Sequence, residues 1–128
     1  MAAGDLDASI EAFMLFAAGP HRSLDDVDPD ITGRLRRMAR ATMSKHTAGE
    51  ASLLVPVRDT WDRVAKIDVP VLAINGTIDS PDHMGMAERL TSTVANGRAV
   101  SIGGTAHYPN MERPIVFNDI LEDFVRTV

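Results

Sequence analysis

The sequence has no cysteine in its 128 residues, which excludes disulfide bonds, thiolate nucleophiles and cysteine-based zinc sites. It also lacks the basic and then apolar N-terminal pattern of a secretory signal, and its longest apolar runs are far too short to span a membrane. We therefore expect a cytoplasmic protein with no membrane association. An excess of basic residues is missing as well. The formal net charge of −5 argues against nucleic-acid binding, because phosphates are neutralised by Lys and Arg.

The first part of the chain, residues 1–50, is predicted to be helical. Its apolar residues recur at three- and four-residue steps, as on one face of a helix: Leu6, Ile10, Phe13, Met14 and Ala17. Gly19-Pro20 ends this helix. A second amphipathic helix, expected to end near Ala48-Gly49, is indicated by Ile31, Leu35, Met38 and Thr42 or Met43. Its basic residues spread over more than one face and predict a solvated surface: Arg34, Arg36, Arg37 and Arg40.

The second part, residues 51–128, alternates between helices and strands. A short helix is expected at Trp61–Ile67. The continuously apolar run Val71–Ile74 is typical of a strand covered on both faces, and Ala99–Ile102 gives a second strand. Between them, Ser80 is a suitable N-cap and Pro81 a suitable first residue for a helix. The inward face of this helix is expected to comprise Met84, Ala87, Leu90 and Val94.

The last helix is predicted to begin at Pro114, and its apolar residues follow a 3.6-residue period: Phe117, Ile120, Leu121, Phe124, Val125 and Val128. The order is then strand, helix, strand, helix. A right-handed crossover makes the two strands parallel and brings the loops that follow them to the same edge of the sheet, where open α/β sheets bind ligands.

Those two loops contain Asp79 and His107. A carboxylate in one loop can accept a hydrogen bond from Nδ1–H of an imidazole in the other, which fixes the tautomer and stabilises the imidazolium when Nε2 takes a proton. From spacing alone we favour a simpler interpretation, in which Asp79 caps the following helix and His107 is a loop residue with ordinary partners.

The residue patterns around Asp79 and His107 favour the interpretation as an acid–base pair. The segments VPVLAINGTIDSPDH and SIGGTAHYPNMERPIVFNDILEDF closely resemble the C-terminal stretch of α/β-hydrolases. In that family an apolar strand leads to Gly-x-x-Asp, the catalytic His follows a Gly-x-x-His turn, and Pro-x-x-Glu-x-Pro-x-x-Phe begins the last helix. The matching residues are Gly76 with Asp79, Gly104 with His107, and Pro109, Glu112, Pro114 and Phe117.

The resemblance implies that Asp79 is the acid of a catalytic triad and His107 its general base. It is closest to the small-molecule branch that includes enol-lactonases, esterases and carbon–carbon bond hydrolases. The segment GDLDASIEAFMLFAAGP also resembles the helical lid of the family. The expected fold class is therefore α/β, as the C-terminal portion of an α/β-hydrolase. Residues 1–50 would form the lid (cap) segment and residues 51–128 the C-terminal part of the core.

The sequence departs from the family in having no Gly-x-Ser-x-Gly nucleophile motif, and the His-Gly type loop that supplies oxyanion donors is also absent. In the family both elements precede the lid. Losing the nucleophile removes the covalent route, and losing the oxyanion donors lowers the rate by orders of magnitude. We therefore expect the chain to be inactive alone, and to self-associate or dock onto a complementary N-terminal fragment. The substrate and the residues that bind it are not predicted.

Asp82 and His83 lie one turn into the crossover helix and offer alternatives. Asp82 could replace Asp79 as the acid, and both could contribute with Asp79 and His107 to a metal site. No His-x-x-x-His or carboxylate–histidine spacing supports a metal site, so no metal and no cofactor are expected.

Two other functions compete with the hydrolase interpretation. One is a non-catalytic remnant that uses the helices of residues 1–50 and the open sheet edge to bind another protein. The other is a regulatory α/β domain with Asp79 as a phosphoacceptor, which requires an acidic cluster and a lysine on neighbouring strands that the sequence does not show.

Overall fold

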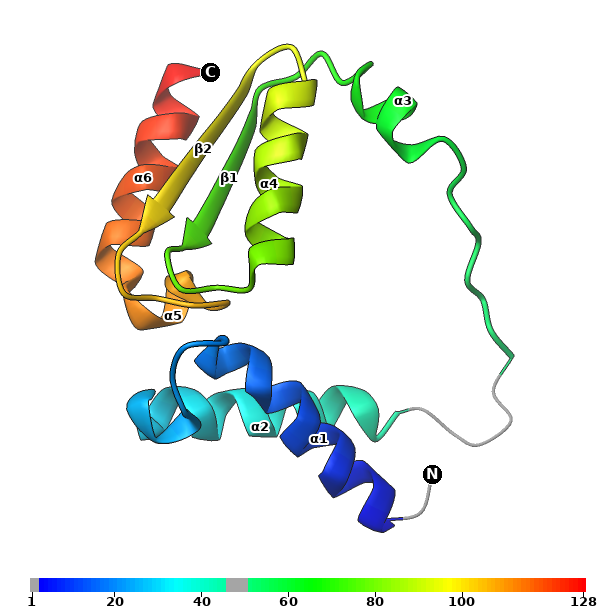
Figure 1. Cartoon of the computed structure of the whole chain (residues 1–128), viewed down its shortest axis with the longest axis vertical. Helices are drawn as coiled ribbons and strands as arrows, with labels where there is room; N and C mark the ends of the chain where they lie inside the picture. The colour runs from blue at the N-terminus through cyan, green and yellow to red at the C-terminus, as the bar shows by residue number, and fades with distance from the viewer. Residues whose placement is uncertain (1–2, 46–50) are drawn as a thin grey trace. The chain divides into compact units, whose positions relative to one another are not determined.

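A computed structural model describes residues 3–45 and 51–128, and the chain divides into two compact units, Met1–Val55 and Pro56–Val128. In the described residues, the regular elements of the first unit are helices, and the second unit contains two strands with their flanking helices (Figure 1). The division expected at Ala48-Gly49-Glu50 lies outside the described residues. Among the helices of the described residues, none is long and apolar enough to cross a membrane.

The first unit is a pair of helices joined by a short turn. Helix α1 covers Ala3–Ala18, the 3-10 turn η1 covers Leu24–Asp26, and helix α2 covers Pro29–Met43. Helix α2 begins at Asp28, whose side chain accepts a hydrogen bond from the Asp30 N–H at 2.8 Å. It ends at Met43, earlier than the predicted end near Ala48-Gly49, because the backbone continues as a turn at Ser44 and Lys45.

The core of the first unit confirms the predicted face of α1 and corrects that of α2. Ile10, Met14 and Ala17 are buried, as their spacing predicts. On α2, however, the buried residues are Thr32, Leu35 and Ala39, whereas Met38 is 50% exposed. These three recur at three- and four-residue steps and so share a face that Met38 does not lie on. The hydroxyl of Thr32, which makes its side chain look polar in the sequence, donates to the Pro29 carbonyl at 3.1 Å.

Two of the four arginines of α2 form ion pairs with α1. Arg36 binds Glu11 through both carboxylate oxygens, at 2.9 and 3.0 Å, and Arg40 binds Asp7. The side chains of both pairs are substantially exposed, so each pair contributes little to stability.

The second unit contains the two strands. Its elements are helix α3 (Thr60–Val64), strand β1 (Val71–Gly76), helix α4 (Pro81–Thr93), strand β2 (Gly97–Ile102), helix α5 (Pro109–Glu112) and helix α6 (Pro114–Thr127). The strands are parallel, as predicted, with Val71 opposite Gly97 and Gly76 opposite Ile102. They lie between α4 and α6 (Figure 1). The loops after Gly76 and after Ile102 therefore leave the sheet at the same edge.

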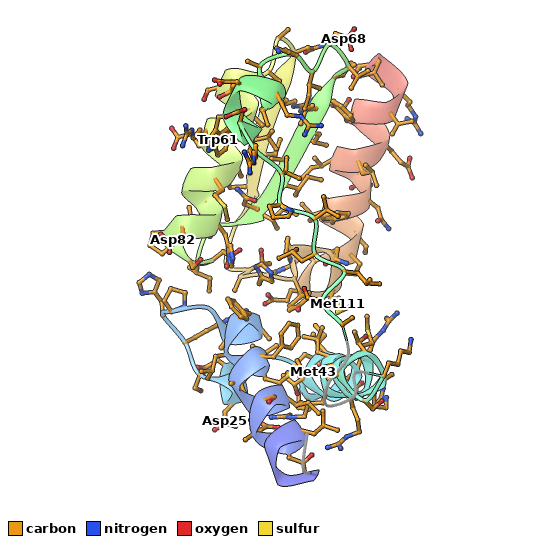
Figure 2. The ribbon with its side chains drawn as sticks, turned by 90° about the vertical axis from the view of Figure 1, so that its right-hand side faces the viewer. Asp25, Met43, Trp61, Asp68, Asp82 and Met111 are labelled. Carbon is orange, nitrogen blue, oxygen red and sulfur yellow. The ribbon has the colours of Figure 1, made fainter. Side chains whose placement is uncertain are left out.

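Short contacts fix the helices around the strands. Helix α4 begins as predicted, because the Ser80 side chain accepts from the His83 N–H and Pro81 occupies the first turn. The guanidinium of Arg89 on α4 lies 3.9 Å from the centre of the ring of Trp61, which Figure 2 labels on α3, and this contact joins α3 to α4. Arg98 on β2 pairs with Asp123 on α6 at 3.0 Å.

The strands are less covered than their apolar sequence predicts. The first five residues of β1 are only half-buried, and on β2 only Ile102 is fully buried. Helix α6 has no fully buried residue. Of the apolar positions predicted for this helix, Phe117, Ile120 and Phe124 are half-buried, and Leu121 and Val125 are exposed. Val128, also predicted, is exposed and follows the end of the helix. Full burial of a parallel strand needs layers on both faces and neighbours at its edges, and the sheet of the described residues has two strands.

Candidate active site

The loop that carries Asp79 is fastened to the loop that carries His107. Past the end of β1, the Thr77 N–H donates to the Ile102 carbonyl and the Ile78 N–H to the Thr105 carbonyl, each at 3.1 Å. In return, the Gly104 N–H donates to the Thr77 hydroxyl at 3.0 Å. These bonds continue the strand pairing beyond the sheet and bring the two loops side by side.

Two glycines of the recognised motifs make this approach possible. A Cβ atom on Gly76 would lie 2.1 Å from the Thr105 carbonyl oxygen, so no side chain fits where β1 meets the histidine loop. Gly104 has a φ of 73°, in the left-handed region that glycine adopts without a steric cost. The Gly-x-x-Asp and Gly-x-x-His patterns therefore have a physical basis in this chain. The first glycine allows a close backbone contact, and the second adopts a left-handed backbone conformation.

Asp79 and His107 meet at this edge of the sheet. The His107 Nδ1 lies 3.0 Å from Asp79 Oδ2. The Asp79 residue is 7% exposed, whereas the His107 side chain is 35% exposed. A buried carboxylate thus contacts Nδ1 of an imidazole ring that is partly exposed to solvent.

The electrostatics favour an ionised Asp79. Burial raises the pKa of the Asp79 carboxyl. Hydrogen bonds from the Ser80 backbone N–H, from His107 and from His83 outweigh burial and hold this pKa below its ordinary value. An ionised carboxylate only accepts hydrogen bonds, so Nδ1 of His107 carries the proton and Nε2 of the neutral ring carries the lone pair. This is the tautomer that a general base requires.

A third side chain, His83 on α4, joins the pair. Its Nδ1 lies 3.4 Å from Asp79 Oδ1 and 2.9 Å from the Ser80 hydroxyl oxygen. Its ring centre is 4.5 Å from that of His107, with the two rings inclined at 37°. Asp79 Oδ1 also accepts the Ser80 N–H at 2.7 Å. Both oxygens of Asp79 are therefore engaged, one by each histidine.

Ser80, His83 and Asp79 contain the residue types of a triad but not its geometry. In a triad the base uses opposite ring nitrogens for the serine and the carboxylate. Here the same atom, Nδ1 of His83, faces both partners. The Ser80 hydroxyl also caps α4. Ser80 is consequently a structural residue. Asp82, the alternative acid, is exposed at the start of α4 (Figure 2), whereas Asp79 makes the bond to His107.

The histidine loop is supported from the other side by α5, a short helix that the sequence patterns did not predict. Glu112 at the end of this helix accepts a hydrogen bond from the Ala106 N–H at 3.0 Å. The residue before His107 is thereby fixed, which gives Glu112 of the Pro-x-x-Glu pattern a physical role. Tyr108 packs edge-on against the His107 ring, with centres 5.2 Å apart, and burial raises the pKa of Tyr108.

The comparisons with known proteins agree on the fold. No family model and no curated protein matches the sequence. The matching solved structures include a proline iminopeptidase of Mycobacterium smegmatis (TM-score 0.57, 19% identity, 98% of this chain and 44% of that one). They also include a hydrolase of Pseudomonas aeruginosa (TM-score 0.55, 20% identity, 98% of this chain and 51% of that one). The chain thus spans about half the length of the structures it matches.

Both structures have the α/β-hydrolase fold, so the predicted fold class is confirmed: the chain has the fold of the C-terminal portion of an α/β-hydrolase. At these identities the similarity concerns the fold alone. The assignment to a small-molecule branch stays a prediction, as do the catalytic roles of Asp79 and His107.

Proposed function

We propose that this chain supplies the acid–base half of a serine-hydrolase active site, with Asp79 as the triad acid and His107 as the general base. The observation that carries the proposal is the 3.0 Å contact between a buried carboxylate and Nδ1 of a partly exposed imidazole. This contact lies at the carboxyl ends of the two parallel strands, where their loops begin, and the matching solved structures are hydrolases.

In the proposed reaction, Nε2 of His107 takes the proton of a serine hydroxyl as that oxygen attacks a carbonyl carbon. Asp79 stabilises the imidazolium that results, and the ring then returns the proton to the leaving group. The sequence contains no Gly-x-Ser-x-Gly, so the serine and the oxyanion donors come from a complementary N-terminal half. The substrate class we propose is an ester, lactone or related bond of a small molecule, with the helices of the first unit as the lid.

The exposed apolar residues of the second unit support a complementary half as the partner. Ile115, Leu121 and Val125 on α6 are 76%, 41% and 61% exposed, and the strands are only partly covered. The matching structures are about twice as long as this chain, which leaves room for the missing layers. Without that half, we expect the same surface to drive self-association.

Hydrolysis of a short-chain aryl ester tests the proposal. The chain is assayed alone and after mixing with the N-terminal half of a related hydrolase that carries Gly-x-Ser-x-Gly. We expect no activity above background from the chain alone and activity in the mixture. His107→Ala should abolish that activity, whereas His21→Ala, an exposed histidine of the first unit, should leave it unchanged. Activity that survives His107→Ala would remove His107 from the mechanism.

A second candidate function is that of a non-catalytic module that binds another protein. The observation that favours it is the same exposed apolar surface on α6. The two functions differ in their dependence on His107: partner binding without activity, unaffected by His107→Ala, supports the module.

A further inference from the structure

The cluster of Asp79, His83 and His107 has a geometry that an acid–base pair does not need. One carboxylate oxygen and one ring nitrogen from each histidine lie within 4.8 Å of one another. The Nδ1 atoms of the two histidines contact the two oxygens of this single carboxylate, His83 Nδ1 at Oδ1 and His107 Nδ1 at Oδ2. Both rings therefore direct their Nδ1 atoms toward one region.

We propose that Asp79, His83 and His107 form a binding site for a divalent transition-metal ion of the zinc type. Two imidazole nitrogens and one carboxylate oxygen are a ligand set that Zn²⁺ accepts, with a fourth position left for water. Mg²⁺ and Ca²⁺ prefer sets made of oxygen and suit this site poorly. The site uses the same Nδ1 atom of His107 that Asp79 contacts.

The position of the three residues in the fold suits a metal site. Asp79 is buried and its backbone is held by the strand-end bonds, so the anionic ligand is fixed. The side chains of His83 and His107 are 28% and 35% exposed, which gives an ion access from solvent. Ligand atoms around Zn²⁺ stand ~2.0–2.2 Å from the metal, so binding must draw the three ligand atoms closer together than the 4.8 Å within which they now lie.

Metal binding through Nδ1 requires a change of proton at His107. Coordination uses the lone pair of Nδ1, so the neutral His107 ring must change tautomer: the proton leaves Nδ1, where it is shared with Asp79, and Nε2 becomes protonated. With Nε2 protonated, His107 has no lone pair for a serine hydroxyl. The metal-bound form is therefore expected to be inactive, a consequence that rests on the proposed function, whereas the binding itself does not.

Co²⁺ and Zn²⁺ binding to the full 128-residue chain tests the site. We expect Co²⁺ to give the visible absorption bands of a site with nitrogen ligands, and Zn²⁺ to displace it. Zn²⁺ should also raise the melting temperature reversibly on addition of a chelator, because an ion bound only by the folded state stabilises it. Mg²⁺ at the same concentration should produce neither effect.

Variants at the site separate ligation from folding. His83→Ala lies on a partly exposed helix position, and loss of a ligand should weaken Zn²⁺ binding by at least ~10-fold. His21→Ala is the matched control and should bind as the unmodified chain does. Circular dichroism establishes that His83→Ala is folded. Equal Zn²⁺ affinity in His83→Ala, or no Co²⁺ bands in the unmodified chain, would overturn the proposal.

The esterase assay in the mixed system provides the second arm. Zn²⁺ should inhibit the mixture, and His83→Ala should require at least ~10-fold more Zn²⁺ for the same inhibition. Metal binding without any esterase activity would leave the metal site standing and reject the proposed function. Activity without metal binding would do the reverse.

Discussion

Asp79 illustrates how one buried side chain can organise two loops. Its Oδ1 accepts the Ser80 N–H and faces His83, and its Oδ2 faces His107. The carboxylate therefore links the start of α4 to the loop after β2. Replacing Asp79 removes all of these contacts. Because the ionised carboxylate is the form that accepts them, the contribution of Asp79 to stability should depend on its charge.

Asp79→Asn should remove part of the acid sensitivity of the fold. Because the folded pKa of Asp79 lies below its ordinary value, the ionised group stabilises the fold above the unfolded pKa, and this contribution is lost as pH falls through the folded pKa. Denaturant unfolding at pH 7 and at about pH 3, below the ordinary aspartate range, measures the loss. The unmodified chain should lose more stability between the two pH values than Asp79→Asn.

The exposed Asp119 provides the control for this experiment. Asp119→Asn should show the same acid-induced loss as the unmodified chain. If Asp79→Asn and Asp119→Asn behaved alike, the ionised Asp79 would have no special part in holding the loops.

Gly76→Ala should separate the two loops. The new Cβ would meet the Thr105 carbonyl oxygen at 2.1 Å, and a backbone atom cannot rotate away as a side chain can. We expect a loss of about 1–3 kcal/mol in the free energy of unfolding, the usual cost of overpacking. The downfield NMR signal expected of the His107 Nδ1–H should weaken in parallel.

Gly103→Ala is the matched control, since a Cβ there meets nothing within 4 Å and its φ is not positive. This substitution should change stability by less than about 0.5 kcal/mol. A similar loss of stability at both glycines would mean that the close contact with the Thr105 carbonyl is not the reason why Gly76 excludes a side chain.

At the scale of elements, the start of α4 couples secondary structure to the site. The Ser80 hydroxyl accepts the His83 N–H and lies 2.9 Å from His83 Nδ1. The same residue thus begins the helix and contacts the second histidine of the cluster. Its replacement should alter both the helix and the histidine.

Ser80→Ala should lower the free energy of unfolding by about 0.5–2 kcal/mol, the usual cost of losing an N-cap. Thermal or denaturant unfolding followed by circular dichroism measures this change. Ser92→Ala, an exposed position inside the same helix, should be neutral because alanine is the better helix former. Equal effects at the two serines would contradict the capping role.

Element types were largely predictable because the apolar periodicities are strong. The parallel strands, the crossover helix with its Ser80-Pro81 start and the last helix all occur where the sequence predicts them. The buried face of α2 was misplaced, because Thr32 and Ala39 bury polar or small side chains that hydropathy does not favour. Helix α5 was missed because four residues are too few to show a period.

The site was predictable in part. Strand topology predicts that Asp79 and His107 leave the same edge, and the structure brings them within hydrogen-bond distance. The sequence offered His83 as one alternative for a metal site with Asp79 and His107, but it did not predict the contact of this ring with Asp79, which His83 follows by four residues. Asp79 precedes the helix, so the spacing has no fixed geometry until the capped turn at Ser80 is known.

At the scale of the whole molecule, the second unit exposes much of its apolar surface. Leu121 and Val125 follow the helical period of α6 but are 41% and 61% exposed, and only part of that stripe is covered. Surfaces of this kind are rare on isolated monomers and are typical of sites where other chains pack.

The chain alone should therefore self-associate in a concentration-dependent way. Analytical ultracentrifugation should show a sedimentation coefficient that rises with concentration, and Val125→Asp should reduce the rise by placing a charge on the apolar surface. Ser92→Asp, at an exposed position of α4, adds the same charge away from α6 and should not. A monomer at all concentrations would show that the exposed residues do not attract another chain.

All three side chains of the cluster belong to the unit Pro56–Val128, and every contact described for them lies within it. If the proposed chemistry is correct, the acid–base pair that moves the proton is already formed within this unit. Any completing polypeptide then has to bring only an attacking oxygen and donors for the anion, so quite different first halves could be paired with this one.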